Sequence, residues 1–314
     1  MFALRCVDVS LAFFVALYCL LSCLVTRSWR PVASVMRRFS PRFAANLLFS
    51  LRIAPFFLAM SVTAIFVLPS FVLLEPRTVS ERMADTPLAL SACCIALLIV
   101  GFHSAARAQS LTSQAVTVWL REATPIGTNG TVPVYRIRPD VPALTVAGVC
   151  LPKVLVSNAA AALLTSQEMR TALRHELAHV RHRDNLKKLL FRFTIFPGMT
   201  GLETAWSEFG EMAADDAAVS NAEDALDLAS ALIKLSRLVP SFPDAILTTA
   251  LVQGSKASIN ARVARLVAWQ EPDASQPALP WFVVPTGVGA CVALIASYSS
   301  MLIDMHKVTE WLVR

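Results

Sequence analysis

Residues 174–184 read RHELAHVRHRD, and this stretch decides how the rest of the chain is interpreted. It contains the pattern HExxH, formed by His175, Glu176 and His179. On a helix, residues four apart lie on one face, so the two imidazoles can bind one metal ion together. Glu176 follows the first histidine, and its carboxylate can reach a water on an open coordination position. Two nitrogens, a third ligand from elsewhere, a water and a base are what a zinc hydrolase requires.

The segment before this pattern favours a helix. Thr165 or Ser166 can cap its N-terminus with Glu168 in the first turn, and apolar residues then recur at helical spacing (Met169, Leu173, Leu177 and Val180). The chain has only five histidines, so an accidental HExxH is uncommon. The alternative is an exposed amphipathic helix with two solvated histidines, and a third ligand would decide between the two.

A second helical stretch, residues 211–219, reads EMAADDAAV and offers that ligand. Glu211 can complete a His-His-Glu zinc site, and Asp215, one turn later, can accept the other ring N–H of a ligating histidine and fix its tautomer. Glu208 competes for the ligand role. Glu211 is favoured because an aspartate lies four residues after it and because the small residues that follow it let two helices approach closely. The alternative is a solvated helix face that carries both Glu211 and Asp215.

Several motifs between about Val149 and Val219 support a family resemblance. They are LVS at 155–157, LTxxE at 164–168, HELAH at 175–179 with RD at 183–184, IFP at 195–197 and ExxADD at 211–216. This stretch resembles the integral-membrane gluzincin peptidases of the BlaR/MecR antirepressor type and, more distantly, the HtpX type. The flanking residues match only loosely.

The resemblance implies that His175, His179 and Glu211 bind zinc, that Glu176 is the general base, and that Asp215 supports a ligating histidine. The HtpX type has transmembrane helices between its HExxH and its glutamate. Here only the short apolar stretch 189–196 lies there, interrupted by an arginine, which favours the BlaR/MecR type. Sensors of that type carry a large extracellular ligand-binding domain after the last span. Only about eleven residues follow the last expected span here, so antibiotic sensing is not expected.

The composition indicates a membrane protein with a soluble insert. Of the 314 residues, 55% are hydrophobic and only 16% are charged, and the apolar residues are concentrated in segments. The net charge of +6 comes largely from one arginine cluster, and no basic stripe with interleaved aromatics indicates nucleic-acid binding. Six of the seven cysteines lie in or beside apolar segments, so neither a disulfide framework nor a cysteine metal site is expected.

Four spans are predicted at about residues 9–25, 53–74, 87–106 and 281–303. A cleaved signal peptide is the alternative for the first span, and Leu20–Cys23 is faintly similar to a lipobox. Five arginines and no acidic residue lie between Arg27 and Arg42, and the positive-inside rule places them in the cytoplasm. The expected protein is therefore a multi-pass protein of the inner or plasma membrane, with a cytoplasmic catalytic domain and both termini outside.

The expected fold is an α-helical membrane protein with a mainly α (α+β) gluzincin-like domain inserted between the third and fourth spans. Its domains are 1–108 with three spans, 109–279 as the metallopeptidase, and 280–314 as the fourth span and tail. Strands are predicted at Val132–Ile137, Thr145–Val149 and Lys153–Ser157. The stretch Thr145–Ser157 is expected to supply an edge strand that pairs with extended substrate. Helices are predicted at Asp224–Leu238 and Ile259–Trp269.

The expected function is that of a zinc metalloendopeptidase with one zinc ion per chain. The expected substrate is a cytoplasmic or membrane-proximal protein, such as a transcriptional repressor, in regulated proteolysis. A separate sensor protein or a second copy of the chain are the partners left open, besides membrane lipid. Residues proposed to stabilise the transition state are Tyr135, His182 and Arg262, with Arg265 as a further candidate.

Three alternative functions are weighed against this one. The first is a catalytically silent signalling scaffold with a zinc-stabilised domain, and the second is an HtpX-type quality-control protease. A transporter is less favoured, because the spans contain few acidic residues. Asp184 is expected to form only a local salt bridge with Arg183 or a helix-end contact.

Overall fold

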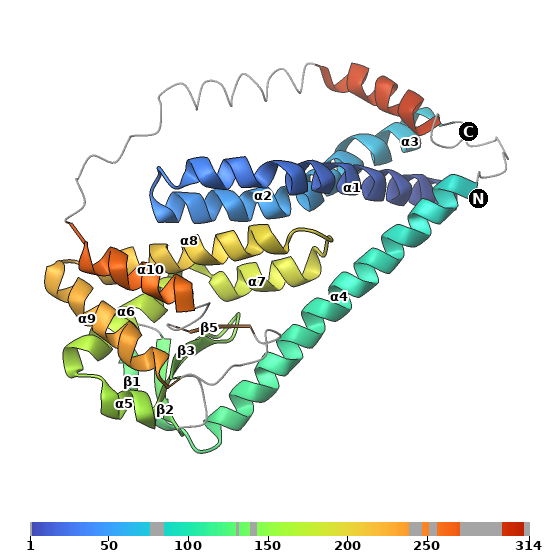
Figure 1. The fold of residues 1–314 in the computed structure, drawn as a ribbon. Coiled ribbons are helices and arrows are strands. Elements are labelled where there is room, and N and C mark those ends of the chain that lie inside the picture. Colours follow the sequence, from blue (N-terminus) through green and yellow to red (C-terminus); the bar gives the residue numbers. More distant parts are fainter. Residues whose placement is uncertain are drawn as a thin grey trace. The chain divides into compact units, whose positions relative to one another are not determined.

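The computed structural model describes residues 2–75, 85–129, 132–138, 143–238, 247–250, 256–270 and 297–310. The chain is mostly helical, with one small sheet (Figure 1). It divides into two compact units. The smaller unit contains residues 1–27, 53–100 and 273–314, and the larger contains residues 28–52 and 101–272. Of the arginine cluster, Arg27 therefore belongs to the smaller unit, whereas Arg30, Arg37, Arg38 and Arg42 belong to the unit that carries the HExxH pattern.

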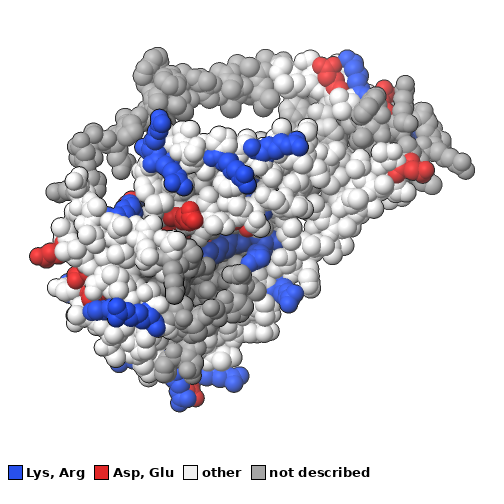
Figure 2. All heavy atoms as spheres, in the orientation of Figure 1, with Lys and Arg blue, Asp and Glu red and all other residues white. Residues whose placement is uncertain are grey.

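Three helical stretches are long and apolar enough to cross a membrane. They are α1 (Phe2–Met36); α2 (Pro41–Val62), continued by the π-helical turn η1 (Thr63–Val67) and α3 (Leu68–Leu74); and α4 (Asp85–Leu120). Each contains one of the first three expected spans. In Figure 2 charged side chains are sparse along α4. Of the fourth expected span, 281–303, residues 281–296 lie outside the described residues, and residues 297–310 are helical.

The larger unit contains a five-stranded sheet in the order β1-β2-β4-β3-β5. The strands are β1 (Thr124–Asn129), β2 (Val132–Ile137), β3 (Leu144–Ala147), β4 (Lys153–Ser157) and β5 (Thr248–Ala250). β2 and β4 are parallel, whereas the other neighbours are antiparallel. The predicted strands correspond to β2, β3 and β4, and the sequence analysis missed both outer strands.

The prediction that Thr145–Ser157 supplies a free edge strand is wrong. β3 lies between β4 and β5, and Val146 pairs with Thr249 of β5. The Thr145 hydroxyl also donates a hydrogen bond to the Thr249 carbonyl, which fastens the short strand. β5 follows the metal-binding residues in the sequence and spans only three residues. A strand this short has no alternating pattern by which it could be recognised.

The two faces of the sheet pack against different helices. Val134, Val146 and Val154 belong to the main core, which also contains residues of α6 (Ser166–His182), α8 (Thr200–Ala218), α9 (Ala222–Ser236) and α10 (Lys256–Val267). Ile137 and Leu155 point to the other face and pack against the end of α4. This alternation follows the period of two in a strand. The short helices α5 (Asn158–Leu163) and α7 (Asp184–Phe193) complete the unit.

The helix that carries HExxH begins where the sequence predicts. Thr165 is the N-cap of α6, and Glu168 completes a capping box by accepting a hydrogen bond from the Thr165 backbone N–H. The Glu168 carboxylate also binds Lys234 of α9 at 2.7 and 2.8 Å. Burial raises the pKa of Glu168, but its hydrogen bonds to Lys234, Ser230 and Thr165 outweigh this and lower it to about 2. One carboxylate therefore holds the start of α6 against α9.

Glu168→Gln should lower the free energy of unfolding of this unit by about 2–3 kcal/mol, because a folded-state pKa below the ordinary value stabilises the fold above pH 4.5. In the wild-type protein this contribution should be lost as the pH falls from about 4.5 to about 2. Thermal midpoints of the full-length protein in detergent micelles, measured across that range, test this. Glu223→Gln, at an exposed glutamate of α9, is the control. Equal midpoints for Glu168→Gln and wild type at pH 7 would contradict the assignment.

Candidate metal centre

Three buried side chains converge between α6 and α8. His175 and His179 lie one turn apart on α6, and Glu211 comes from α8, which packs against it. The two Nε2 atoms are 3.1 Å apart. Glu211 places Oε2 3.5 Å from Nε2 of His175 and Oε1 3.5 Å from Nε2 of His179. Among the described residues these three form a group that could hold a metal ion. The exposed Glu208 is not part of it.

Asp215 and Arg262 support this group from one side. Nδ1 of His175 lies 3.0 Å from Oδ1 of Asp215. Arg262 of α10 donates from Nε and Nη2 to the two oxygens of Asp215, at 2.8 and 2.6 Å, and from Nη1 to Oε2 of Glu211 at 2.8 Å. The side chains of Glu211, Asp215 and Arg262 are buried, so each charge is stabilised by its opposite charges in the cluster. Asp215 thus lies beside a histidine, as expected, and this histidine is His175.

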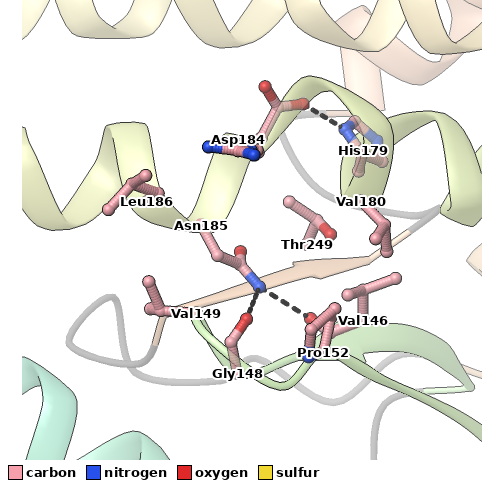
Figure 3. Close-up of a pocket in the computed structure, with 11 residues that line it drawn as sticks. Val146, Gly148, Val149, Pro152, His179, Val180, Asp184, Asn185, Leu186 and Thr249 are labelled. Atoms are coloured by element: carbon pink, nitrogen blue, oxygen red, sulfur yellow. Dashed lines mark hydrogen bonds and ion pairs between the residues drawn. The ribbon is translucent and has the colours of Figure 1, made fainter. Parts of the chain in front are cut away.

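Asp184 supports the second histidine, which the sequence analysis did not predict. Oδ2 of Asp184 lies 2.7 Å from Nδ1 of His179 (Figure 3), and Lys187 donates to Oδ1 at 3.2 Å. The chain changes direction after α6 because Arg183, between α6 and α7, has a left-handed backbone with φ of 54°, and this change brings Asp184 back to His179. α7 starts immediately after this break, with Asp184 as its first residue. The expected pairing with Arg183 is thus replaced by a contact with His179.

The charges at the site favour a bound cation. Each histidine faces a carboxylate through Nδ1, and each Nε2 is turned toward the other and toward Glu211. Burial lowers the pKa of His175, but Asp215 and Glu211 outweigh it and raise the pKa to about 9. In the metal-free protein a proton would therefore occupy this place. Burial raises the pKa of Glu211, yet Arg262 and the two histidines together outweigh it, so the pKa lies below its ordinary value and the carboxylate stays ionised.

The spacing of the donor atoms fits zinc. Zn–N bonds of about 2.0–2.1 Å at the tetrahedral angle place two ligand atoms about 3.3 Å apart. The observed separations of 3.1 and 3.5 Å lie on either side of that value. Two imidazoles with one carboxylate are also a donor set that catalytic zinc sites use, with a fourth position left for water or substrate. The three residues present therefore fit this metal without rearrangement of the backbone.

Glu176 lies beside the first ligand and is fully buried. Its negative charge favours the protonated forms of Arg262 and of Lys188 on α7. Burial lowers the pKa of Lys188 by more than the nearby carboxylates raise it, so this pKa lies below its ordinary value. Nζ of Lys188 donates to the Thr248 carbonyl of β5 at 2.7 Å, so β5 is tied to the helix next to the site. The position of Lys188 could not be predicted, because no local sequence pattern indicates which way its side chain points.

The residues proposed to stabilise a transition state lie in different places. Tyr135 packs with Leu155 on the sheet face opposite the metal helix, so this structure does not bring it to the site. His182 ends α6 partly buried, and burial lowers its pKa. Arg262 is at the site, where it donates hydrogen bonds to Asp215 and Glu211. Arg265 donates to the Met212 carbonyl and to Asp216. Arg262 is therefore best described as a residue that holds the ligand carboxylates.

Asp184→Ala should weaken zinc binding by about 10–100-fold, because the ring of His179 loses the acceptor that fixes its tautomer and orientation. Competition with a chromophoric chelator on the purified full-length protein would measure the effect. Asp224→Ala is the matched control, since Asp224 forms an ion pair with Arg174 at 2.9 Å but contacts neither histidine. Equal zinc affinities for Asp184→Ala and wild type would show that the contact with His179 does not support the metal.

Comparison of the chain with protein-family models and with curated protein sequences finds no match.

Proposed function

We propose that this protein is a membrane-anchored zinc metalloendopeptidase of the gluzincin class, similar to the BlaR/MecR antirepressor type. The observation that carries the proposal is the meeting of His175, His179 and Glu211 with the carboxylate of Glu176 next to them. A zinc ion held only for structure usually has four protein ligands and needs no neighbouring base. Three protein ligands, an open position and an adjacent glutamate are instead the parts that hydrolysis requires.

Each residue has a defined task in this mechanism. His175, His179 and Glu211 would hold the zinc ion, which supplies Lewis-acid activation of water and of the scissile carbonyl when bound. Asp215 and Asp184 keep Nδ1 of the two histidines protonated, so that both Nε2 atoms stay available as ligands. Arg262 helps to keep Glu211 ionised. Glu176 takes the proton of the attacking water and passes it to the leaving amine.

The proposed location follows from charge and hydropathy. Three helical stretches can cross a membrane, and Arg30, Arg37, Arg38 and Arg42 belong to the same unit as the metal ligands. The positive-inside rule would then place the site on the cytoplasmic side. A tethered site there favours regulated cleavage of a few cytoplasmic or membrane-proximal proteins, a transcriptional repressor among them. Broad digestion of unrelated soluble proteins by the purified enzyme would count against regulated cleavage.

The test compares protein N-termini in cells that carry the wild-type protein with those in cells that carry Glu176→Gln. The substitution keeps the side-chain shape and the three ligands but removes the base. New N-termini that occur only with the wild-type protein would support an endopeptidase and identify its substrate, including any cleavage of the chain itself. Identical N-termini in both cell lines, under growth, envelope stress and heat stress, would favour the silent scaffold.

A further inference from the structure

Arg52 is a buried charge that the proposed mechanism does not use. It lies on α2, directly before the apolar stretch of the second span, and only 2% of its surface is exposed. All three of its nitrogens donate hydrogen bonds. Nε binds Oε1 of Glu203 at 2.8 Å, Nη1 binds the Thr194 hydroxyl at 3.1 Å, and Nη2 binds the carbonyls of Thr194 at 2.8 Å and Phe191 at 3.4 Å. Burial of a guanidinium is costly unless it is paired in this way.

These partners are the end of one helix and the beginning of the next. Thr194 is the C-cap of α7, where backbone carbonyls lack helical partners and a cation is favourable. Glu203 lies in the first turn of α8. One side chain thus replaces the missing partners of α7 and holds α8 through an ion pair. Its planar fork suits this double role better than an ammonium group would.

The same two helices present metal-site carboxylates. α7 begins with Asp184, which contacts His179, and spans about 15 Å to the residues that Arg52 binds. α8 carries Glu211 about 12 Å beyond Glu203. Since a short helix moves as a rigid body, a shift at the 191–203 segment would displace both carboxylates. Arg52 thus binds one end of each of the two helices that carry these carboxylates.

The other two candidate spans also approach this segment within the larger unit. A Cβ atom on Gly201 would lie 2.7 Å from the ring of Trp29, on α1. A Cβ atom on Gly101, on α4, would lie 2.2 Å from the Phe193 carbonyl oxygen. A side chain at position 101 would require a shift of the backbone, and a side chain at position 201 would require the Trp29 ring to move. Each of the three membrane-length helices thus meets the end of α7 or the start of α8, and Arg52 supplies the charged contact.

We infer that Arg52 is a positioning residue for the metal centre, through which helix α2 holds Asp184 and Glu211 in register around the histidines. The inference rests on the proposed zinc site. It extends that site to a residue that touches neither metal nor substrate.

The experiment uses full-length protein in detergent micelles, loaded with cobalt(II) in place of zinc. The d–d absorption of cobalt(II) reports ligand geometry without any turnover. Arg52→Met should change this spectrum and weaken zinc binding by about tenfold, at the low end for residues that support ligands indirectly. Arg52→Lys keeps the charge but not the planar guanidinium, so its zinc affinity should lie between those of Arg52→Met and the wild-type protein. A folded Arg52→Met protein with the wild-type spectrum and zinc affinity would overturn the inference.

Ser157→Ala controls for loss of stability alone. It removes the N-cap of α5, where the Ser157 hydroxyl accepts a hydrogen bond from the Ala160 N–H at 3.0 Å, and α5 carries none of the metal-site residues. We expect a lower thermal midpoint with an unchanged cobalt spectrum. If Arg52→Met does not fold, Glu203→Gln takes its place, because it weakens the hold on α8 and keeps the bonds to α7. A wild-type spectrum for Glu203→Gln would then overturn the inference.

Failure of the inference and failure of the proposed function give different results. Wild-type protein that binds one metal ion but yields no cleavage would contradict the peptidase and leave the Arg52 comparison valid. Cleavage by Arg52→Met at the wild-type rate, with a wild-type spectrum, would overturn only the role of Arg52. Wild-type protein that binds neither zinc nor cobalt would overturn both.

Discussion

Glu176→Gln should slow peptide hydrolysis by about 10²–10⁴-fold while the zinc content stays unchanged. Glu176 is fully buried beside His175, yet it is not one of the three converging ligands. The amide has nearly the same shape as the carboxylate, so the substitution should leave the metal ligands in place. The glutamine amide cannot accept the proton of the attacking water, so the loss of activity should appear as a lower kcat.

The measurement is single-turnover cleavage of a peptide that spans the scissile bond identified in cells, with zinc determined on the same samples. Glu208→Gln is the matched control, because Glu208 is an exposed glutamate of α8 outside the ligand group. A variant at position 176 that retains the wild-type rate would show that another group acts as the base. Loss of zinc together with activity would show that Glu176 supports the metal rather than the proton transfer.

Glu211→Gln should raise the zinc dissociation constant by more than the 10–100-fold that loss of a ligand-supporting residue costs. The change removes the one negative charge among the three ligand side chains, and that charge offsets the cost of a buried dication. It also weakens the ion pair between position 211 and Arg262, which binds Asp215 as well. We therefore expect a lower thermal midpoint in addition to the loss of zinc.

Chelator competition and thermal unfolding of the same preparation separate the two effects. Glu208→Gln again serves as the control for a glutamate of α8 that lies outside the cluster. Wild-type zinc affinity in Glu211→Gln would mean that a different residue provides the third ligand. In that case the convergence of Glu211 with the two histidines would not reflect metal binding.

The parts of the site that follow helical spacing could be predicted from the sequence. His175 and His179 are four residues apart on one helix, and their common face follows from the geometry of that helix alone. Thr165 and Glu168 form the capping box that starts this helix. Glu211 needed one further clue, which was an aspartate one turn later among small residues. Such local patterns are visible in a single sequence because their spacing is set by the backbone.

The contacts that do not follow helical spacing were not predicted. Asp184 reaches His179 only because the left-handed residue Arg183 ends one helix and starts the next. Arg262 is separated from Asp215 by the whole of α9 and by β5, so no local pattern indicates their pairing. Arg52 lies next to an apolar span, where a positive charge usually indicates membrane topology. Its hydrogen-bond partners are more than 130 residues away in the sequence. Each of these contacts is set by packing between elements.

The most direct test of the central claim is the zinc content of the purified full-length protein, combined with X-ray absorption at the zinc edge. The account predicts one zinc ion per chain, bound by two imidazole nitrogens with oxygen in the remaining positions, and little zinc in His175→Ala. A wild-type protein without zinc, or one whose zinc is bound by cysteine sulfur, would contradict it.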